Sequence, residues 1–341
     1  MKKFAGAAFA CATGLVLATP AEAVVIGSGS DSLYRALAAN FASVGQIYGT
    51  DSTGGFAASG VVIASNWVLT AGHVTSGATS LSFFLDGGGD FSSFATRTGI
   101  AATNWLTNSG YNGNLNSGYD IGLIHFDTNF TTAYGIAPAV LYTGTGEVGK
   151  VGTMVGYGAT GTGATGDVTF DGLKRAGQNM IDAVAITPGK DNRILLSDFD
   201  SGLASDNSYG SAVPHALEAM IAPGDSGGGL FIPCGSAGYA DDCLAGITSF
   251  GWGRLDGDPN SDFGDVGGFT RVSSFVSWIN GIIGGSSSGG GGKGGGPKPR
   301  GASGFAATSI VVDVPEPVTL SVFGIGLAGV LSLRRRKMKA G

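Results

Sequence analysis

Short apolar runs, each about the length of a β-strand, recur along the middle of the chain. Clusters of Gly, Asn, Ser and Asp separate them, which is typical of strands joined by turns. The clearest runs cover residues 60–63, 67–70, 121–126, 152–155, 244–250 and 268–272. Apolar residues at helical spacing occur at 32–41 and, more regularly, at 275–282. The pattern predicts an all-β domain that ends in a helix.

The N-terminus has the three parts of a secretory signal peptide. Two lysines precede an apolar run over residues 4–18, and Ala21-Glu22-Ala23 supplies a cleavage site. The run is too short to span a bilayer comfortably, so an uncleaved anchor is the weaker alternative. We expect residues 1–23 to be removed and the mature domain to begin at Val24.

A Gly-rich linker and an apolar tail follow the domain. Residues 284–304 include 11 glycines and cannot bury a core, so we expect a flexible coil. Within the last segment, 305–341, an apolar stretch at 318–333 precedes four basic residues. That stretch is marginal for a membrane span, and the basic cluster beside it would stay in the cytoplasm. The tail therefore predicts an inner-membrane helix with the domain outside the cytoplasm.

Charge and composition narrow the class of protein. The chain has 341 residues with a net charge of −6, and 63 residues are Gly. Residues 24–283 carry 9 Lys or Arg against 22 Asp or Glu, a net −13, whereas the two ends together carry +7. A nucleic-acid-binding domain would normally have a basic face, so this class is excluded. The many glycines, without a collagen period, indicate tight turns.

Two cysteines remain once the signal peptide is removed. They are Cys234 and Cys243, and an exported domain matures in an oxidising compartment, so we expect a disulfide between them. A metal site would need further ligands of the usual kind nearby, and the sequence offers none there.

A serine flanked by glycines is the strongest chemical signal. Residues 224–228 read GDSGG around Ser226. A nucleophilic serine needs an exposed hydroxyl on a tight turn, beside N–H groups that face the oxyanion, and glycines permit both. The α/β-hydrolase order would place the acid and the histidine after the serine. All three histidines, His73, His125 and His215, precede Ser226, so that order is excluded.

The order His, Asp, Ser fits instead. His73 follows the run at 67–70, Asp120 heads the run at 121–126, and Ser226 comes last, as in chymotrypsin. We expect His125 and His215 to be incidental. Five further motifs occur in matching order: TAGH (70–73), YDIGLI (119–124), VGYG (155–158), SFG (249–251) and GFTRV (268–272). On these motifs, residues 24–283 resemble a trypsin-like (chymotrypsin-fold) serine protease.

The resemblance implies two six-stranded antiparallel β-barrels, split near residue 150, with a C-terminal helix. It implies an exported serine endopeptidase in which Ser226 forms an acyl-enzyme, His73 transfers the proton and Asp120 orients His73. The N–H groups of Gly224 and Ser226 would form the oxyanion hole. Asp225 resembles the residue that pairs with a new N-terminus. No cofactor is required.

The tail carries a second resemblance. Pro315, Glu316 and Pro317 stand before the apolar stretch and the basic cluster. This order resembles the PEP-CTERM sorting signal of exopolysaccharide-producing Gram-negative bacteria. It implies recognition by an exosortase and a secreted or envelope-associated domain; an ordinary C-terminal anchor is the alternative.

The resemblance to trypsin-like proteases also implies a specificity pocket, whose base is found by counting back from the serine. Met220, six residues before Ser226, would lie at its base, and its walls would include Ser249, Phe250, Gly251 and Gly267. Because Met220 is not acidic, we expect a preference for apolar residues, large ones included, rather than for Lys or Arg. A small shift in alignment would instead bring in Glu218.

The new N-terminus has two candidates. Residues 24–27, VVIG, faintly resemble the start of a mature family member and would be exposed by signal peptidase, so that the Val24 amine could pair with Asp225. Cleavage after Arg35 is the alternative.

Calcium is left as an alternative at two places. Residues 256–262 space Asp and Asn side chains like a calcium loop but lack its Gly and Glu, so a solvated acidic loop is favoured. Whether Asp198 and Asp200 bind calcium is left equally open by the sequence.

Two rival functions stay open beside the endopeptidase. One is a catalytically silent trypsin-like domain that binds a partner in the envelope. The other is an esterase that uses the same three residues.

Overall fold

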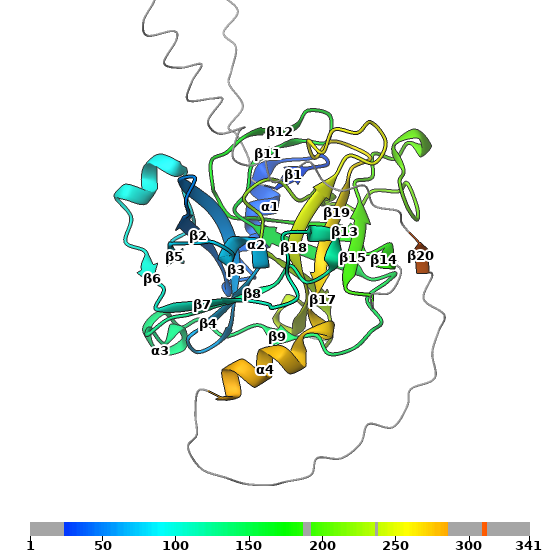
Figure 1. Ribbon diagram of the computed structural model, residues 1–341. Coiled ribbons are helices and arrows are strands. Elements are labelled where there is room, and N and C mark those ends of the chain that lie inside the picture. Colours follow the sequence, from blue (N-terminus) through cyan, green and yellow to red (C-terminus); the bar gives the residue numbers. More distant parts are fainter. Residues whose placement is uncertain (1–23, 187–191, 236–237, 286–308, 312–341) are drawn as a thin grey trace, which may run out of the picture.

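The computed structural model describes residues 24–186, 192–235, 238–285 and 309–311 (Figure 1). Two large, strongly curled sheets lie side by side, one drawn in blue and cyan and the other in green and yellow. The structure therefore has the two-barrel architecture expected from the motifs. Residues 1–23 and 312–341, with the expected signal peptide and sorting signal, lie outside the described residues, as does most of the linker.

The first sheet holds seven strands, all antiparallel. Their order is β6 (Ile100–Ala101), β5 (Ser80–Phe84), β2 (Val44–Thr50), β3 (Gly55–Ala64), β4 (Trp67–Thr70), β8 (Gly122–His125) and β7 (Asn104–Thr107). Thr70, at the end of β4, pairs with Gly122, at the start of β8. The residues that follow β4 and the residues that precede β8 therefore lie beside one another, at the same end of these two strands.

The second sheet holds nine strands. The main path is β13 (Arg175–Met180), β10 (Val151–Gly156), β17 (Gly229–Pro233), β18 (Asp242–Trp252), β19 (Val266–Arg271), β15 (Ile194–Asp198), β14 (Ala183–Ile186) and β20 (Ser309–Val311). The short strand β9 (Val140–Leu141) pairs with β18. Short strands thus extend this sheet beyond six members, and β20 adds a piece of the tail in parallel to β14.

A small third sheet carries the first described residues. It joins β12 (Gly166–Thr169), β11 (Thr160–Thr162), β1 (Val25–Ile26) and β16 (Ala219–Met220). In β1, Val25 pairs with Met220 and Ile26 with Ala219. The start of the expected mature chain is therefore hydrogen-bonded to the strand that precedes the GDSGG turn.

Four α-helices complete the described part: α1 (Asp31–Ala38), α2 (Gly72–Thr75), α3 (Phe130–Tyr134) and α4 (Val276–Gly285). Short 3₁₀ turns are η1 (Phe91–Ala95), η2 (Leu115–Ser117), η3 (Ala204–Asp206), η4 (Gly238–Asp241) and η5 (Val272–Ser274). Helices α1 and α4 match the two predicted at 32–41 and 275–282. None of the helices among the described residues is long and apolar enough to cross a membrane.

One apolar core joins the two large sheets. Val61, Leu69 and Leu123 of the first sheet share a buried cluster with Phe231 and Ile247 of the second. Burying one such side chain contributes roughly 1.5–3 kcal/mol. The terminal helix contributes Ile279 to the same cluster, so it closes the base of the molecule.

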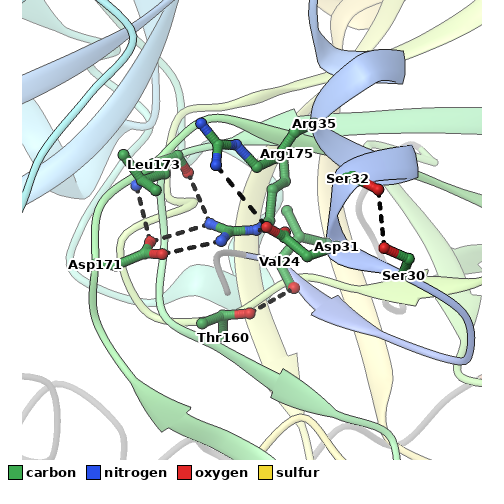
Figure 2. Close-up of polar contacts among 9 residues, drawn as sticks. All are labelled: Val24, Ser30, Asp31, Ser32, Arg35, Thr160, Asp171, Leu173 and Arg175. Atoms are coloured by element: carbon green, nitrogen blue, oxygen red, sulfur yellow. Dashed lines mark hydrogen bonds and ion pairs between the residues drawn. The ribbon is translucent and has the colours of Figure 1, made fainter. Parts of the chain in front are cut away.

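A buried arginine ties helix α1 to the second barrel (Figure 2). The Arg175 side chain is fully buried, donates to the carboxylate of Asp31, and makes bonds of 2.9 and 3.0 Å to Asp171. Burying a charge is tolerated when it is paired and hydrogen-bonded, as it is here. Next to this network, Thr160 Oγ1 donates to the Val24 carbonyl at 3.1 Å.

The expected disulfide between Cys234 and Cys243 is present, with a Cα–Cα distance of 5.8 Å. It links the end of β17 to the start of β18, which also pair through Pro233 and Asp242. The bond therefore closes a hairpin connection whose strands are already held together by the sheet.

Candidate active site

His73 lies in the short helix α2, directly after β4. Its backbone N–H donates to Asp120 Oδ1 at 2.7 Å, and its ring Nδ1 lies 2.8 Å from Asp120 Oδ2. The pairing of β4 with β8 brings the two residues together, because each lies just beyond the last paired residues, Thr70 and Gly122. Two contacts from one carboxylate fix both the backbone and the ring of the histidine.

Asp120 is completely buried and receives donors from both barrels. Ser249 Oγ donates to Asp120 Oδ2 at 2.6 Å, and Thr270 Oγ1 donates to the Asp120 carbonyl at 2.7 Å. Ser249 is the extra residue of a β-bulge in β18, where the register with β19 shifts between Thr248 and Phe250. A bulge can re-aim a side chain, and this one turns Ser249 towards the acid.

The electrostatics favour a protonatable His73. Burial of the ring opposes protonation, but the Asp120 carboxylate attracts the proton and accepts a hydrogen bond, and the net effect raises the pKa of His73 above its ordinary 6.5. About a fifth of the His73 side chain is exposed, so the ring can reach a substrate. The pair has the chemistry of a general base held by an acid.

Ser226 lies on a turn that glycines make possible. Gly224 and Gly227, on either side, have φ of +98° and +83°, a region that side chains with a Cβ rarely adopt. A Cβ at Gly227 would lie 2.0 Å from Thr70 Oγ1 and 3.0 Å from the Ala71 nitrogen. The serine turn therefore packs against the segment that leads into His73. The Ser226 carbonyl also accepts from the Ser59 N–H at 2.8 Å.

Two backbone N–H groups of this turn make no hydrogen bond within the described chain. The N–H groups of Asp225, Gly227 and Gly228 donate to carbonyls at 3.0, 2.9 and 2.7 Å. Those of Gly224 and Ser226 have no such acceptor among the described residues. N–H groups beside a serine that are free to bind a ligand are what an oxyanion hole requires.

Asp225 is buried between the turn and the strand end after β10. Its carboxylate accepts from Gly158 N at 2.8 Å and from Ala222 N at 2.9 Å. A Cβ at Gly156 or Gly158 would lie 2.1 or 2.6 Å from this carboxylate, so both positions must be glycine. Burial raises the pKa of Asp225 to about 7, although the two N–H donors and the charge of Arg175 act in the opposite direction.

A small cavity of about 20 Å³ adjoins Ser226, with room for about one water molecule. Its lining comprises Ile221, Ala222, Pro223, Ser226, Thr248, Ser249, Phe250, Gly251, Pro259 and Ser261. Ser249, Phe250 and Gly251, expected in the walls of a substrate pocket, thus line this cavity. Met220 and Gly267 do not line the cavity: Met220 is 1% exposed, in an apolar cluster with Val25.

The neighbouring residue Ile221 takes the place that counting assigned to Met220. Successive side chains of an extended segment point to opposite faces. Met220 therefore points into the barrel core, while Ile221 reaches the cavity. A Cβ at Gly267 would lie 3.4 Å from Ile221 Cγ1, so the isoleucine fills the space that this glycine leaves.

The other two histidines have structural surroundings. His125 ends β8, with its ring nitrogens 2.8 Å from Asn66 Nδ2 and 2.7 Å from Thr103 Oγ1, and it contacts the edge of Trp67. His215 lies in an irregular segment, where its N–H donates to Glu218 at 2.7 Å. Neither lines the cavity beside Ser226.

Four participants escaped the sequence analysis: Ser59, Thr270, Ile221 and the acid-binding role of Ser249. Ser249 and Thr270 lie in the motifs SFG and GFTRV, but these motifs pointed to substrate binding and to the family resemblance rather than to contacts with Asp120. Ser59 and Ile221 are ordinary residues whose importance comes from contacts between segments far apart in the chain.

Comparison with known proteins shows which family the chain belongs to. The trypsin family model matches residues 35–279, and the PEP-CTERM protein-sorting motif matches residues 313–337. Among curated protein sequences, nothing matches.

Solved structures give the fold. HL collagenase is similar with a TM-score of 0.51 and 19% identity, over 72% of this chain and 94% of the other. The thermostable serine protease AL20, from an extremophilic microorganism, has a TM-score of 0.50 and 17% identity, over 73% of this chain and all of the other (100%). The PEP-CTERM motif indicates sorting outside the cytoplasm of a Gram-negative bacterium. The chain belongs to the trypsin family and is a serine protease with a PEP-CTERM motif at its C-terminus.

Proposed function

We propose that the protein is an exported endopeptidase whose nucleophile is Ser226. The observation that carries the proposal is the double contact of the buried Asp120 with the backbone and ring of His73. His73 takes the proton of Ser226 as its oxygen attacks the peptide carbonyl. It then returns the proton to the leaving amine, so that an acyl-enzyme remains. Water, activated by the same histidine, hydrolyses the acyl-enzyme.

The charges that develop during attack meet fixed partners. The free N–H groups of Gly224 and Ser226 receive the oxyanion, which is worth about 3–4 kcal/mol per donor in comparable sites. Asp120 stabilises the positive imidazole, and Ser249 holds the acid in place. No metal or cofactor is needed for these steps.

The cavity supports a substrate with a small apolar residue before the scissile bond. Ile221, 3% exposed, fills the base, while the Gly251 side is open, since a Cβ there would meet nothing within 4 Å. Neither a carboxylate nor an amine lines the cavity. This differs from the expectation that large side chains also fit, which rested on Met220 at the base and on the small residues Gly251 and Gly267 in the walls.

The mature N-terminus is best placed at Val24. Val24 is 1% exposed and has φ of +56°, which is strained for a β-branched residue. Removal of the preceding residue relieves that strain, because φ then no longer opposes a preceding carbonyl. Residues 158–160 contact both Asp225 and Val24, so the new amine would arise near the buried carboxylate. Cleavage after Arg35 would instead remove β1 and break helix α1.

The C-terminus supports export and sorting. An exosortase would recognise Pro315-Glu316-Pro317, with the apolar helix at 318–333 in the inner membrane and the linker holding the protease away from it. These segments lie outside the described residues, so the support is the motif match at 313–337.

The nucleophile is tested with Ser226→Ala. We expect kcat to fall by roughly 10⁴–10⁶-fold and fluorophosphonate labelling to disappear, with an unchanged melting temperature. The matched control is Ser52→Ala, at an exposed turn. Wild-type protein that resists labelling would support the silent binding domain, and ester hydrolysis without casein hydrolysis would support the esterase.

The general base is tested by the pH dependence of kcat/KM. Protonated His73 cannot accept the serine proton, so activity should fall as the pH drops through the pKa of His73, with a midpoint above 6.5. Asp120→Asn should lower kcat by about 10⁴-fold, the size known from the trypsin example of this substitution. His125→Gln is the control, and its kcat/KM should fall at low pH with the same midpoint as that of the wild type. A midpoint well below 6.5 would contradict this role for Asp120.

The specificity is tested with peptide libraries. Wild-type enzyme should prefer Ala-sized residues before the scissile bond, and Ile221→Ala should raise kcat/KM for Phe relative to Ala by roughly 10–100-fold. Met220→Leu conserves volume outside the cavity lining and should leave the preference unchanged. A wild-type preference for Phe, Lys or Arg would overturn the role of Ile221.

The N-terminus is tested by sequencing the exported, active protein, which should begin at Val24. A form with residues retained before Val24 should lose on the order of 10²-fold in activity, because Asp225 would stay buried without its amine. Arg35→Gln removes the rival cleavage site and should remain fully active. A dependence on Arg35 would contradict the assignment.

A further inference from the structure

Four acidic side chains gather in the second barrel, away from the catalytic residues. They are Asp182, Asp198, Asp200 and Glu218, here called the carboxylate cluster. Asp198, Asp200 and Glu218 are at most 3% exposed, and Asp182 is half-buried. Asp198 ends β15, and Glu218 immediately precedes β16. The cluster therefore lies where the second sheet meets the small sheet of β1 and β16.

Short contacts hold the four residues near one another. The Asp198 N–H lies 3.4 Å from Asp182 Oδ2, and the Asp200 N–H lies 3.5 Å from Glu218 Oε1. The negative charge of Asp198 acts on Asp182 and Asp200, and that of Asp200 acts on Glu218. Asp182, Asp200 and Glu218 thus each feel the repulsion of at least one other member.

Backbone N–H groups, not charged side chains, are the donors to the cluster within the described chain: two of them donate to Asp198 Oδ2, at 2.6 and 2.8 Å, and one donates to Glu218 Oε2, at 2.7 Å. No ion pair there joins any member of the cluster to a Lys or Arg side chain. Two carboxylate oxygens, Asp198 Oδ1 and Asp200 Oδ1, are buried and have no hydrogen-bond partner among the described residues. Buried carboxylates without a counter-charge are costly, and they persist in proteins when a cation binds them.

A neutral side chain adds another free oxygen. Asn179 is completely buried, and its Nδ2 donates to the carbonyls of Asp198, at 2.7 Å, and Ala219, at 3.1 Å. Those bonds fix which end of the amide is oxygen and place the side chain between the segments that carry Asp198 and Glu218. Its Oδ1 has no partner within the described residues. Carboxylate and amide oxygens without nitrogen or sulfur ligands are the donor set of a hard cation.

We propose that the carboxylate cluster and Asn179 bind a calcium ion. No three acidic, His or Cys side chains of the described chain yet converge as a metal-binding group. Binding therefore turns the free oxygens of Asp198 and Asp200 inwards, a change of side-chain torsion with the backbone kept. Calcium suits such a site because it accepts irregular arrangements of six to eight oxygens.

The second acidic region is the less suitable place for the ion. In the loop at 256–262, Asp256 and Asp258 are exposed, and Asp256 already accepts the Asp258 N–H at 2.9 Å. None of its side-chain oxygens is both buried and unpartnered. The free, buried acceptors are in the carboxylate cluster instead.

An ion in the cluster would support the N-terminal segment. The Glu218 carbonyl accepts from Gly27 N at 2.7 Å and from Tyr34 Oη at 3.0 Å, so it holds both β1 and α1. Glu218 also lies three residues before Ile221, at the base of the cavity. Calcium would therefore stiffen the segments that shape the pocket and receive Val24.

The experiment uses the full exported chain after dialysis against a chelator. Calorimetric titration with Ca²⁺ should show one binding site. The melting temperature should rise by roughly 5–10 °C when calcium is a hundredfold above its Kd. Because the readouts are binding and melting, failure here would leave the protease assignment untouched.

Variants locate the site. Asp200→Asn and Glu218→Gln keep the side-chain shape but remove a charge, and each should weaken calcium binding at least about tenfold. Asp256→Asn is the matched control in the exposed loop and should bind like wild type. If a cluster variant does not fold, two other measurements still test the proposal. They are terbium luminescence of the wild type, competed by Ca²⁺, and calcium binding by the Asp256→Asn control. No binding at millimolar calcium, unchanged binding in Asp200→Asn, or loss in Asp256→Asn would overturn the proposal.

Discussion

The hydrogen bonds of the buried Asp120 join His73 of the first barrel to two strands of the second barrel. His73 comes from the first barrel, while Ser249 and Thr270 come from adjacent strands of the second. Asp120 thus fixes the ring of His73 through its carboxylate and holds the second barrel through both its carboxylate and its backbone carbonyl. Because the group is fully buried, each lost donor leaves an acceptor without water to replace it, which costs about 1–3 kcal/mol. The barrels must therefore meet in this arrangement for the acid to be satisfied.

Close approach of backbones is the second constraint, and it accounts for part of the glycine content. Gly227 allows the serine turn to contact Thr70, and Gly156 and Gly158 enclose the Asp225 carboxylate. A Cβ at any of these positions would overlap a neighbour at under 3 Å. These glycines serve contacts between segments, whereas those with positive φ at exposed turns serve only chain reversal.

The sequence was most informative where one short segment contains its own signal. Apolar runs located β4, β10, β18 and β19, because buried strands need continuous apolar residues. Strand β13 was missed, since it carries Arg175 and Asn179, polar residues that burial with partners from other segments makes tolerable. The pocket base was assigned to Met220 rather than Ile221 for a related reason. Position in the sequence does not reveal which of two adjacent side chains faces a cavity.

The structure also shows that the acidic residues of the domain do not all lie on its surface. Several of its carboxylates are buried: Asp120 and Asp225 each have two or more donors, while Asp198 and Asp200 keep free oxygens. In the proposed mechanism, Asp120 orients His73 and Asp225 receives the amine of Val24. The last two lie beside Glu218, whose carbonyl holds β1. On the proposals above, two positive groups would compensate these sets: the Val24 amine, formed when the signal peptide is removed, and a calcium ion bound outside the cytoplasm. Export would thereby supply the charges that complete the folded protease, so that the chain gains its final stability where it acts.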